Sequence, residues 1–155
     1  MSDARLPHQL RAFRESDRNF VVRGWASEMR RASFSRHVPP DVYWPSQHEL
    51  VAQLLSLATT IVACDPENNE HVYGAVVYQP AELAIVHWVY VKGDYRRIGL
   101  AASLVAAAIG DKRPIYCTQP SLLFNEAREL VEKHELIACP YLLLGIAPPP
   151  RERTV

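Results

Sequence analysis

The sequence has little cysteine, no net charge and no long apolar run. Its 155 residues include only three cysteines, Cys64, Cys117 and Cys139, which lie far apart and form no CxxC pair. This spacing indicates neither a disulfide framework nor a zinc site, so we expect a reducing compartment. Lys and Arg total 17, as do Asp and Glu. The net charge therefore gives no general attraction to nucleic acid or to an anionic membrane, and no nucleic-acid partner is expected.

Membrane-spanning and secretory segments are also missing. No apolar stretch reaches spanning length, and the first residues lack the apolar region of a signal peptide. We therefore expect a cytoplasmic protein, in its own cell or in a host, with no membrane partner. The chain is 48% hydrophobic, which suits one domain with a real core. We place that domain at 1–147 and expect the proline-rich tail at 148–155 not to pack regularly.

The chain is organised around the stretch 83–109. The β-branched and aromatic run from Val86 to Val91 predicts a buried central strand. Gly93 and Asp94 are turn residues, and apolar positions recur at helical spacing from Leu100 onward. This is a strand–turn–helix unit, and its join reads Arg96, Arg97, Ile98, Gly99, Leu100, Ala101.

This join could bind an anion. The first N–H groups of a helix have no intrahelical partner, and the helix dipole adds partial positive charge there. Gly99 would let the backbone approach a phosphate closely, and Arg96 and Arg97 would donate to it. The alternative is an ordinary buried strand and amphipathic helix with one turn glycine, and Arg97 would then be a solvated surface residue. The spacing alone does not distinguish between these two interpretations.

The segment V-Y-V-K-G-D-Y-R-R-I-G-L-A resembles motif A of the GNAT (Gcn5-related N-acetyltransferase) superfamily, with Arg96, Gly99 and Ala101 at its defining positions. The resemblance implies that the acyl donor is acetyl-CoA and that its pyrophosphate binds the loop and helix start. It also implies that backbone groups of Val89 and Val91 hold the pantetheine arm. The loop residues concerned are Arg96, Arg97, Ile98, Gly99, Leu100 and Ala101.

The other elements follow from periodicity and turn chemistry. A first strand at 9–13 precedes a helix capped by Ser16 or Asp17, whose inner face carries Val21, Trp25 and Met29. We expect a proline-broken loop at 33–45, a second helix after a capping box at 46–49, strands at 59–64, 71–78 and 114–118, a helix over about 122–131 and a last strand at 141–144. This order matches the α/β (α+β) GNAT fold, a mixed and mostly antiparallel sheet flanked by about four helices.

A narrower resemblance is to small GNAT-like proteins of tailed bacteriophages. Trp25, the run at 39–44, the run at 62–67 and motif A carry it together. It implies a phage structural partner as an alternative to a homo-oligomer.

Catalysis needs a base, a polarised thioester carbonyl and an acid. The backbone amide of Val89 can polarise the carbonyl. The family's usual glutamate position falls on Ile85, whereas His87 resembles a histidine of the arylalkylamine N-acetyltransferases near the acceptor amine, and would be the base. The other interpretation of His87 is a hydrogen-bonded core residue.

The acid is harder to place. Phe124 and Val131 stand where many family members have asparagine and tyrosine, and Asn125 is one position off. Tyr116, Cys117 and Tyr141 are substitutes without positional support. Two functions therefore stay open. One is an acetyl-CoA-dependent N-acetyltransferase acting on an unidentified amine by direct transfer. The other is a GNAT fold that has lost catalysis and serves as a binding or structural module, for example in a phage particle.

Overall fold

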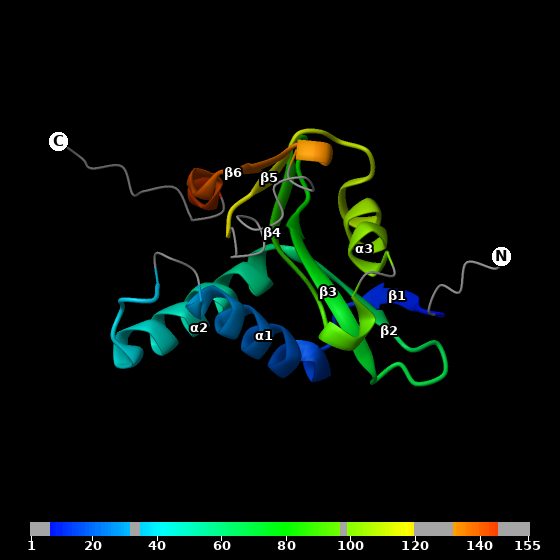
Figure 1. Cartoon of the computed structure of the whole chain (residues 1–155), viewed down its shortest axis with the longest axis horizontal. Helices are drawn as coiled ribbons and strands as arrows, with labels where there is room; N and C mark the ends of the chain where they lie inside the picture. Colours follow the sequence, from blue (N-terminus) through cyan, green and yellow to red (C-terminus); the bar gives the residue numbers. More distant parts are fainter. Residues whose placement is uncertain (1–6, 32–34, 97–98, 120–131, 146–155) are drawn as a thin grey trace.

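The computed structural model of the chain describes residues 7–31, 35–96, 99–119 and 132–145 (Figure 1). Six strands form one sheet in the order β1-β2-β3-β4-β5-β6. The strands β1 (Gln9–Ala12), β2 (Thr59–Cys64), β3 (Val72–Gln79) and β4 (Ala84–Val91) form an antiparallel meander. The last two strands are β5 (Ile115–Cys117) and β6 (Leu136–Ala138). β5 pairs in parallel with β4, and β6 pairs in parallel with β5. The sheet is thus mixed and mostly antiparallel, as the sequence predicts.

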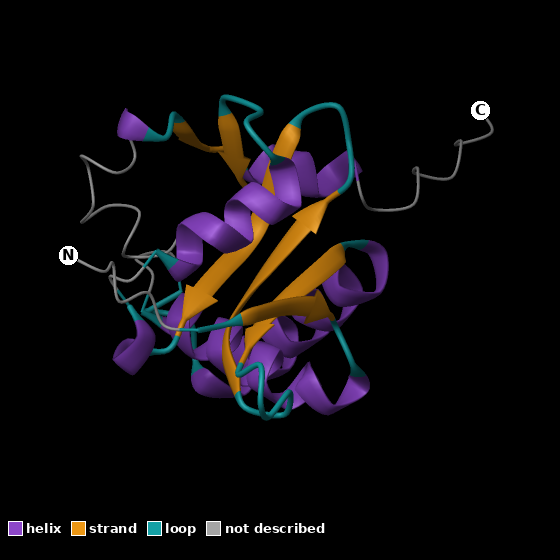
Figure 2. Ribbon diagram, turned by 90° about the vertical axis from the view of Figure 1, so that its right-hand side faces the viewer, coloured by secondary structure: helices purple, strands orange, loops and turns teal. Residues whose placement is uncertain are grey.

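Helices cover both faces of this sheet (Figures 1 and 2). On one face, α1 (Arg18–Arg30) and α2 (Pro40–Leu57) pack over a buried cluster that includes Val21, Trp25, Met29 and Trp88. On the other face, α3 (Leu100–Ile109) packs over a second cluster that includes Val86, Val91 and Leu104. The strands are therefore buried from both sides, which explains their nearly continuous apolar sequences. Within the described residues, no helix is both long and apolar enough to cross a membrane.

The predicted loop at 33–45 is wrong from Pro40 onward, because α2 begins there. Pro40 is the first helical residue, a position where its fixed φ and missing N–H cost nothing. Pro45 lies inside the helix, and tertiary contacts of Tyr43 support the turn before it. The buried Tyr43 hydroxyl donates to the Ala26 carbonyl of α1, and the Arg30 guanidinium lies 4.7 Å from the Tyr43 ring centroid. The predicted capping box at 46–49 is therefore in mid-helix.

The predicted last strand at 141–144 is also wrong. Those residues belong to the 3-10 helix η3 (Pro140–Gly145), and the strand is β6, a few residues earlier. Backbone bonds flank its short ladder with β5: Ile115 N–H donates to the Glu135 carbonyl at 2.9 Å, and Cys139 N–H to the Cys117 carbonyl at 2.8 Å. Pro140 then ends the ladder because it has no N–H. The helix predicted over about 122–131 lies outside the described residues.

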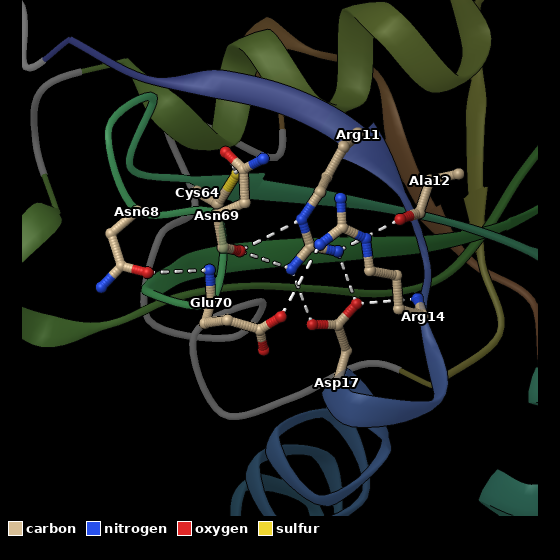
Figure 3. Close-up of polar contacts among 8 residues, drawn as sticks. All are labelled: Arg11, Ala12, Arg14, Asp17, Cys64, Asn68, Asn69 and Glu70. Atoms are coloured by element: carbon tan, nitrogen blue, oxygen red, sulfur yellow. Dashed lines mark hydrogen bonds and ion pairs between the residues drawn. The ribbon is translucent and has the colours of Figure 1, made fainter.

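A buried ion pair joins β1 to the first helix and to the β2–β3 hairpin (Figure 3). The Arg11 guanidinium donates to both Asp17 carboxylate oxygens at 2.7 and 2.8 Å, and the two side chains are only 6% and 2% exposed. Arg11 also donates to the Asn69 carbonyl at 2.8 Å, and Asp17 accepts the Arg14 backbone N–H at 2.8 Å. Asp17 is the residue before α1, as predicted, but its side chain makes no capping hydrogen bond to that helix. Its carboxylate instead belongs to this network with Arg11 and Arg14.

Candidate functional site

The sheet divides where β4 and β5 part, and we call this place the fork. The β4–β5 ladder runs from the Ala84–Ile115 pair to the Val86–Cys117 pair, and the Thr118 N–H then donates to the Val86 carbonyl at 3.2 Å. Beyond that point β4 continues to Val91 with β3 on one side. Within the described ranges, no strand pairs with the other edge of residues 87–91. Backbone donors and acceptors on this edge therefore have no partner strand among the described residues.

Hydrogen bonds identify which residues face the open edge. The Lys92 N–H donates to the Tyr73 carbonyl of β3 at 2.9 Å. Because successive residues of a strand point their backbone groups to opposite sides, Val91 and Val89 face away from β3. The Val91 carbonyl accordingly accepts from Arg96 Nε at 2.8 Å. The structure therefore places the backbone groups of Val89 and Val91 on the open edge.

The start of α3 lies at the end of the segment that leaves β4. Gly99 precedes the helix with a φ of 85°, a left-handed conformation that favours glycine, and has open space where a Cβ would stand. Leu100 is buried and fixes the helix to the core, whereas Ala101 is exposed. The first turn of α3 carries no acidic residue. Its free N–H groups can therefore receive an anion without carboxylate repulsion.

Arg96 follows β4 in the chain and precedes α3. Besides its bond to Val91, its guanidinium carbon is 5.5 Å from the Tyr90 ring centroid. These contacts hold the exposed side chain on the side of the fork. Arg97 and Ile98, the other predicted loop residues, lie outside the described residues.

His87 occupies the apex of the fork. Val86, Val89 and Val91 pack on the α3 side of the sheet and Trp88 on the α1 side, so one extra residue is inserted in β4. The register with β3 shifts at the same place, which makes His87 a bulge residue. His87 is 1% exposed, and its Nδ1 lies 2.7 Å from Thr118 Oγ1.

The pKa of His87 is lower than that of an exposed histidine. Burial lowers its pKa to about 4, so the imidazole is neutral at pH 7. Its Nε2 is buried and has no hydrogen-bond partner among the described residues. An unpaired buried nitrogen of this kind is uncommon in folded proteins and needs an explanation.

Three further polar residues at the fork were not singled out from the sequence. They are Thr118 and Gln119, which directly follow β5, and Gln47 of α2, whose Nε2 donates to Gln119 Oε1 at 3.4 Å. Thr118 and Gln47 are buried. Polar residues directly after a strand are the one sequence signal that could have found the first two.

The substitute acids differ in their positions: Tyr116 and Cys117 belong to β5, which pairs with β4, whereas Tyr141 belongs to η3. Burial raises the pKa of Cys117 to about 11, so its thiol is protonated at neutral pH. Tyr141 is 79% exposed in η3. Phe124, Asn125 and Val131 lie outside the described residues. In the described part of the chain, no cluster of three His, Cys, Asp or Glu side chains could hold a metal ion.

No protein-family model and no curated protein matches the chain, but solved structures do. A proposed acetyl transferase from Pyrococcus furiosus has 17% identity and a TM-score of 0.56, over 86% of this chain and 95% of that one. A possible acetyltransferase from Clostridium difficile 630 has 14% identity and a TM-score of 0.52, over 85% and 91% of the two chains.

A third similar structure is a GCN5-related glucosamine N-acetyltransferase region of a fungal multi-domain protein. It has 15% identity and a TM-score of 0.52, over 83% of this chain and 17% of that chain. The TM-scores show that these structures share the fold of this chain. Identities this low do not identify the substrate. The six-stranded mixed sheet between α1, α2 and α3 is therefore the fold of the GNAT acetyltransferases.

Proposed function

We propose that the protein is an acetyl-CoA-dependent N-acetyltransferase that transfers the acetyl group directly to an amine. The observation that carries this proposal is the open edge of β4, which begins beside the free amino end of α3 and ends at the buried, polar apex of the fork. Arg96, the helix start and the Val89 and Val91 backbone groups supply donors and acceptors along this path. They suit an elongated ligand with phosphates at one end and amides along its length.

The dimensions of the strand agree with this proposal. A strand rises roughly 3.3 Å per residue, so four residues separate Val91 from His87 by roughly 13 Å. Acetyl-CoA bound with its pyrophosphate at Gly99 would extend its pantetheine arm along Val91 and Val89. Its thioester would then lie near the apex, where the Val89 N–H can polarise the carbonyl.

Direct transfer is supported by the chemistry of Cys117. A covalent acetyl-enzyme would need an activated nucleophile, and the Cys117 thiol at the fork has a pKa raised to about 11. Attack by a neutral amine on the bound thioester needs no such group. The acceptor amine, the phage origin and the cytoplasmic location remain predictions from the sequence.

Gly99→Glu should abolish binding of acetyl-CoA, because a side chain would fill the space of the phosphate and its carboxylate would repel the anion. Gly110→Glu is the matched control. Gly110 also has a positive φ (63°), a Cβ added there would also meet nothing within 4 Å, and it lies at the other end of α3. Titration calorimetry with acetyl-CoA on both folded variants measures the effect. Undiminished affinity of Gly99→Glu would refute this placement of the ligand.

A further inference from the structure

The contact between His87 and Thr118 restricts where the imidazole carries its proton. A neutral imidazole has one N–H donor and one nitrogen acceptor, and a threonine hydroxyl has one donor and can also accept. If Nδ1 carries the proton and donates to Thr118, two groups lack a partner among the described residues: the hydroxyl proton of Thr118 and Nε2 of His87. If Thr118 donates to Nδ1, only the Nε2–H group lacks one.

The second arrangement leaves fewer unsatisfied groups, and both side chains are 1% exposed, so water cannot easily compensate. The unpaired atom is then a buried N–H donor at the apex of the fork. A buried donor in a native fold normally has a partner, and at this apex a bound ligand can supply the acceptor.

We infer that Thr118 holds His87 as the Nε2–H tautomer, and that this N–H donates a hydrogen bond to the acyl carbonyl oxygen, so that His87 acts as an electrophilic donor and Thr118 as its positioning residue. This inference rests on the proposed function. It replaces the base role expected for His87 from the sequence.

The reaction balances with His87 keeping its proton throughout. The amine lone pair attacks the thioester carbon, the carbonyl electrons move onto oxygen, and the Nε2–H stabilises the negative charge that develops there. When the carbonyl re-forms, the carbon–sulfur bond breaks and its electron pair leaves with the sulfur. The proton lost by the amine passes through water to the thiolate. The products are the acetylated amine and the free thiol.

The surroundings of His87 suit this donor role better than a base role. Burial holds the pKa of the imidazole near 4, so at neutral pH it is a weak proton acceptor and stays neutral. A fixed, buried neutral donor costs no reorganisation when the oxyanion forms.

The tautomer can be measured without any turnover. Imidazole ¹⁵N NMR of the ligand-free protein should show a protonated Nε2 and an unprotonated, hydrogen-bonded Nδ1. Thr118→Ser keeps the hydroxyl and should keep this signature, whereas Thr118→Val has a similar shape without the hydroxyl and should lose it. A protonated Nδ1 in the wild-type protein, or an unchanged spectrum in Thr118→Val, would overturn the inference.

The donor role is tested with acetyl-CoA labelled with ¹³C at the carbonyl. In the bound state, the carbonyl stretch should lie at lower frequency in the wild-type protein and in His87→Gln, whose amide can donate, than in His87→Ala. Given an acceptor amine, turnover should fall about 100- to 1000-fold in His87→Ala, the usual loss for one such donor, and much less in His87→Gln.

The possible failures are distinguishable. Bound acetyl-CoA with the same carbonyl frequency in the wild-type protein and His87→Ala would refute the donor role and leave the proposed function standing. Turnover lost equally in His87→Gln and His87→Ala, with unchanged acetyl-CoA affinity, would favour the base role instead. Failure of the wild-type protein to bind acetyl-CoA would refute the proposed function, and this inference with it.

Discussion

Replacing Asp17 by alanine should lower the free energy of unfolding by about 3–5 kcal/mol, because it leaves a buried guanidinium without its partner. Arg11 is 6% exposed and donates two charge-assisted hydrogen bonds to the Asp17 carboxylate. The substitution also leaves the Arg14 N–H without its acceptor. Urea unfolding with an unchanged m-value would measure the loss.

Glu15→Ala is the matched control for this prediction. Glu15 pairs with Arg18 at 2.9 Å on the same segment, but both side chains are well exposed. Exposed pairs contribute about 0–1 kcal/mol, so the control should be close to the wild-type protein. Equal losses in the two variants would show that burial of the Arg11–Asp17 pair does not matter.

The same pair gives a pH dependence with a definite sign. Burial would raise the pKa of Asp17, but the hydrogen bonds from Arg11 and Arg14 and their positive charges outweigh it, so the pKa lies below its ordinary 3.8. A lowered pKa of an acid stabilises the fold above the unfolded-state value. This contribution should disappear as the pH falls below about 3.8.

The second large effect is acid destabilisation through His87, in a higher pH window. The native imidazole has a pKa of about 4, against 6.5 for a solvent-exposed imidazole in an unfolded chain. Between these values the unfolded state binds the proton and the native state does not, so stability rises with pH. A difference of this size corresponds to about 3 kcal/mol, which should be lost as the pH falls from 6.5 to 4.

Urea unfolding at several pH values between 7 and 4 measures this loss. In His87→Gln the part of the slope due to His87 should disappear, because glutamine does not titrate. His48→Gln, a change on the exposed side of α2, keeps His87 and should keep the slope. A His87→Gln profile that matches the wild-type protein would contradict the low native pKa.

The sequence predicts the elements whose signals are local. The β-branched run of β4, the strands predicted at 59–64 and 71–78 and the helical spacing after Gly99 each depend on residues close in sequence, and these predictions are confirmed. Prolines 39, 40 and 45 misled the prediction of α2. Their local tendency to break a helix was outweighed by the contacts of Tyr43 with α1, which no periodicity reveals.

Long-range pairing explains the other differences. Leu136–Ala138 and the run at 141–144 are both short apolar segments, and the sequence offers no way to choose which one pairs with β5. Thr118 was overlooked for the same reason. It lies 31 residues from His87, and its importance appears only when the parallel pairing of β4 and β5 brings the two side chains together.

The change from antiparallel to parallel pairing at β4 also affects how the native state opens. The β3–β4 ladder contains six residue pairs, whereas the β4–β5 and β5–β6 ladders contain three each. Local opening is easiest where the fewest bonds must break. Amide hydrogens of β5 and β6 should therefore exchange with solvent faster than those of β3 and β4. The sheet can then open locally at the fork while the β1–β4 meander stays paired.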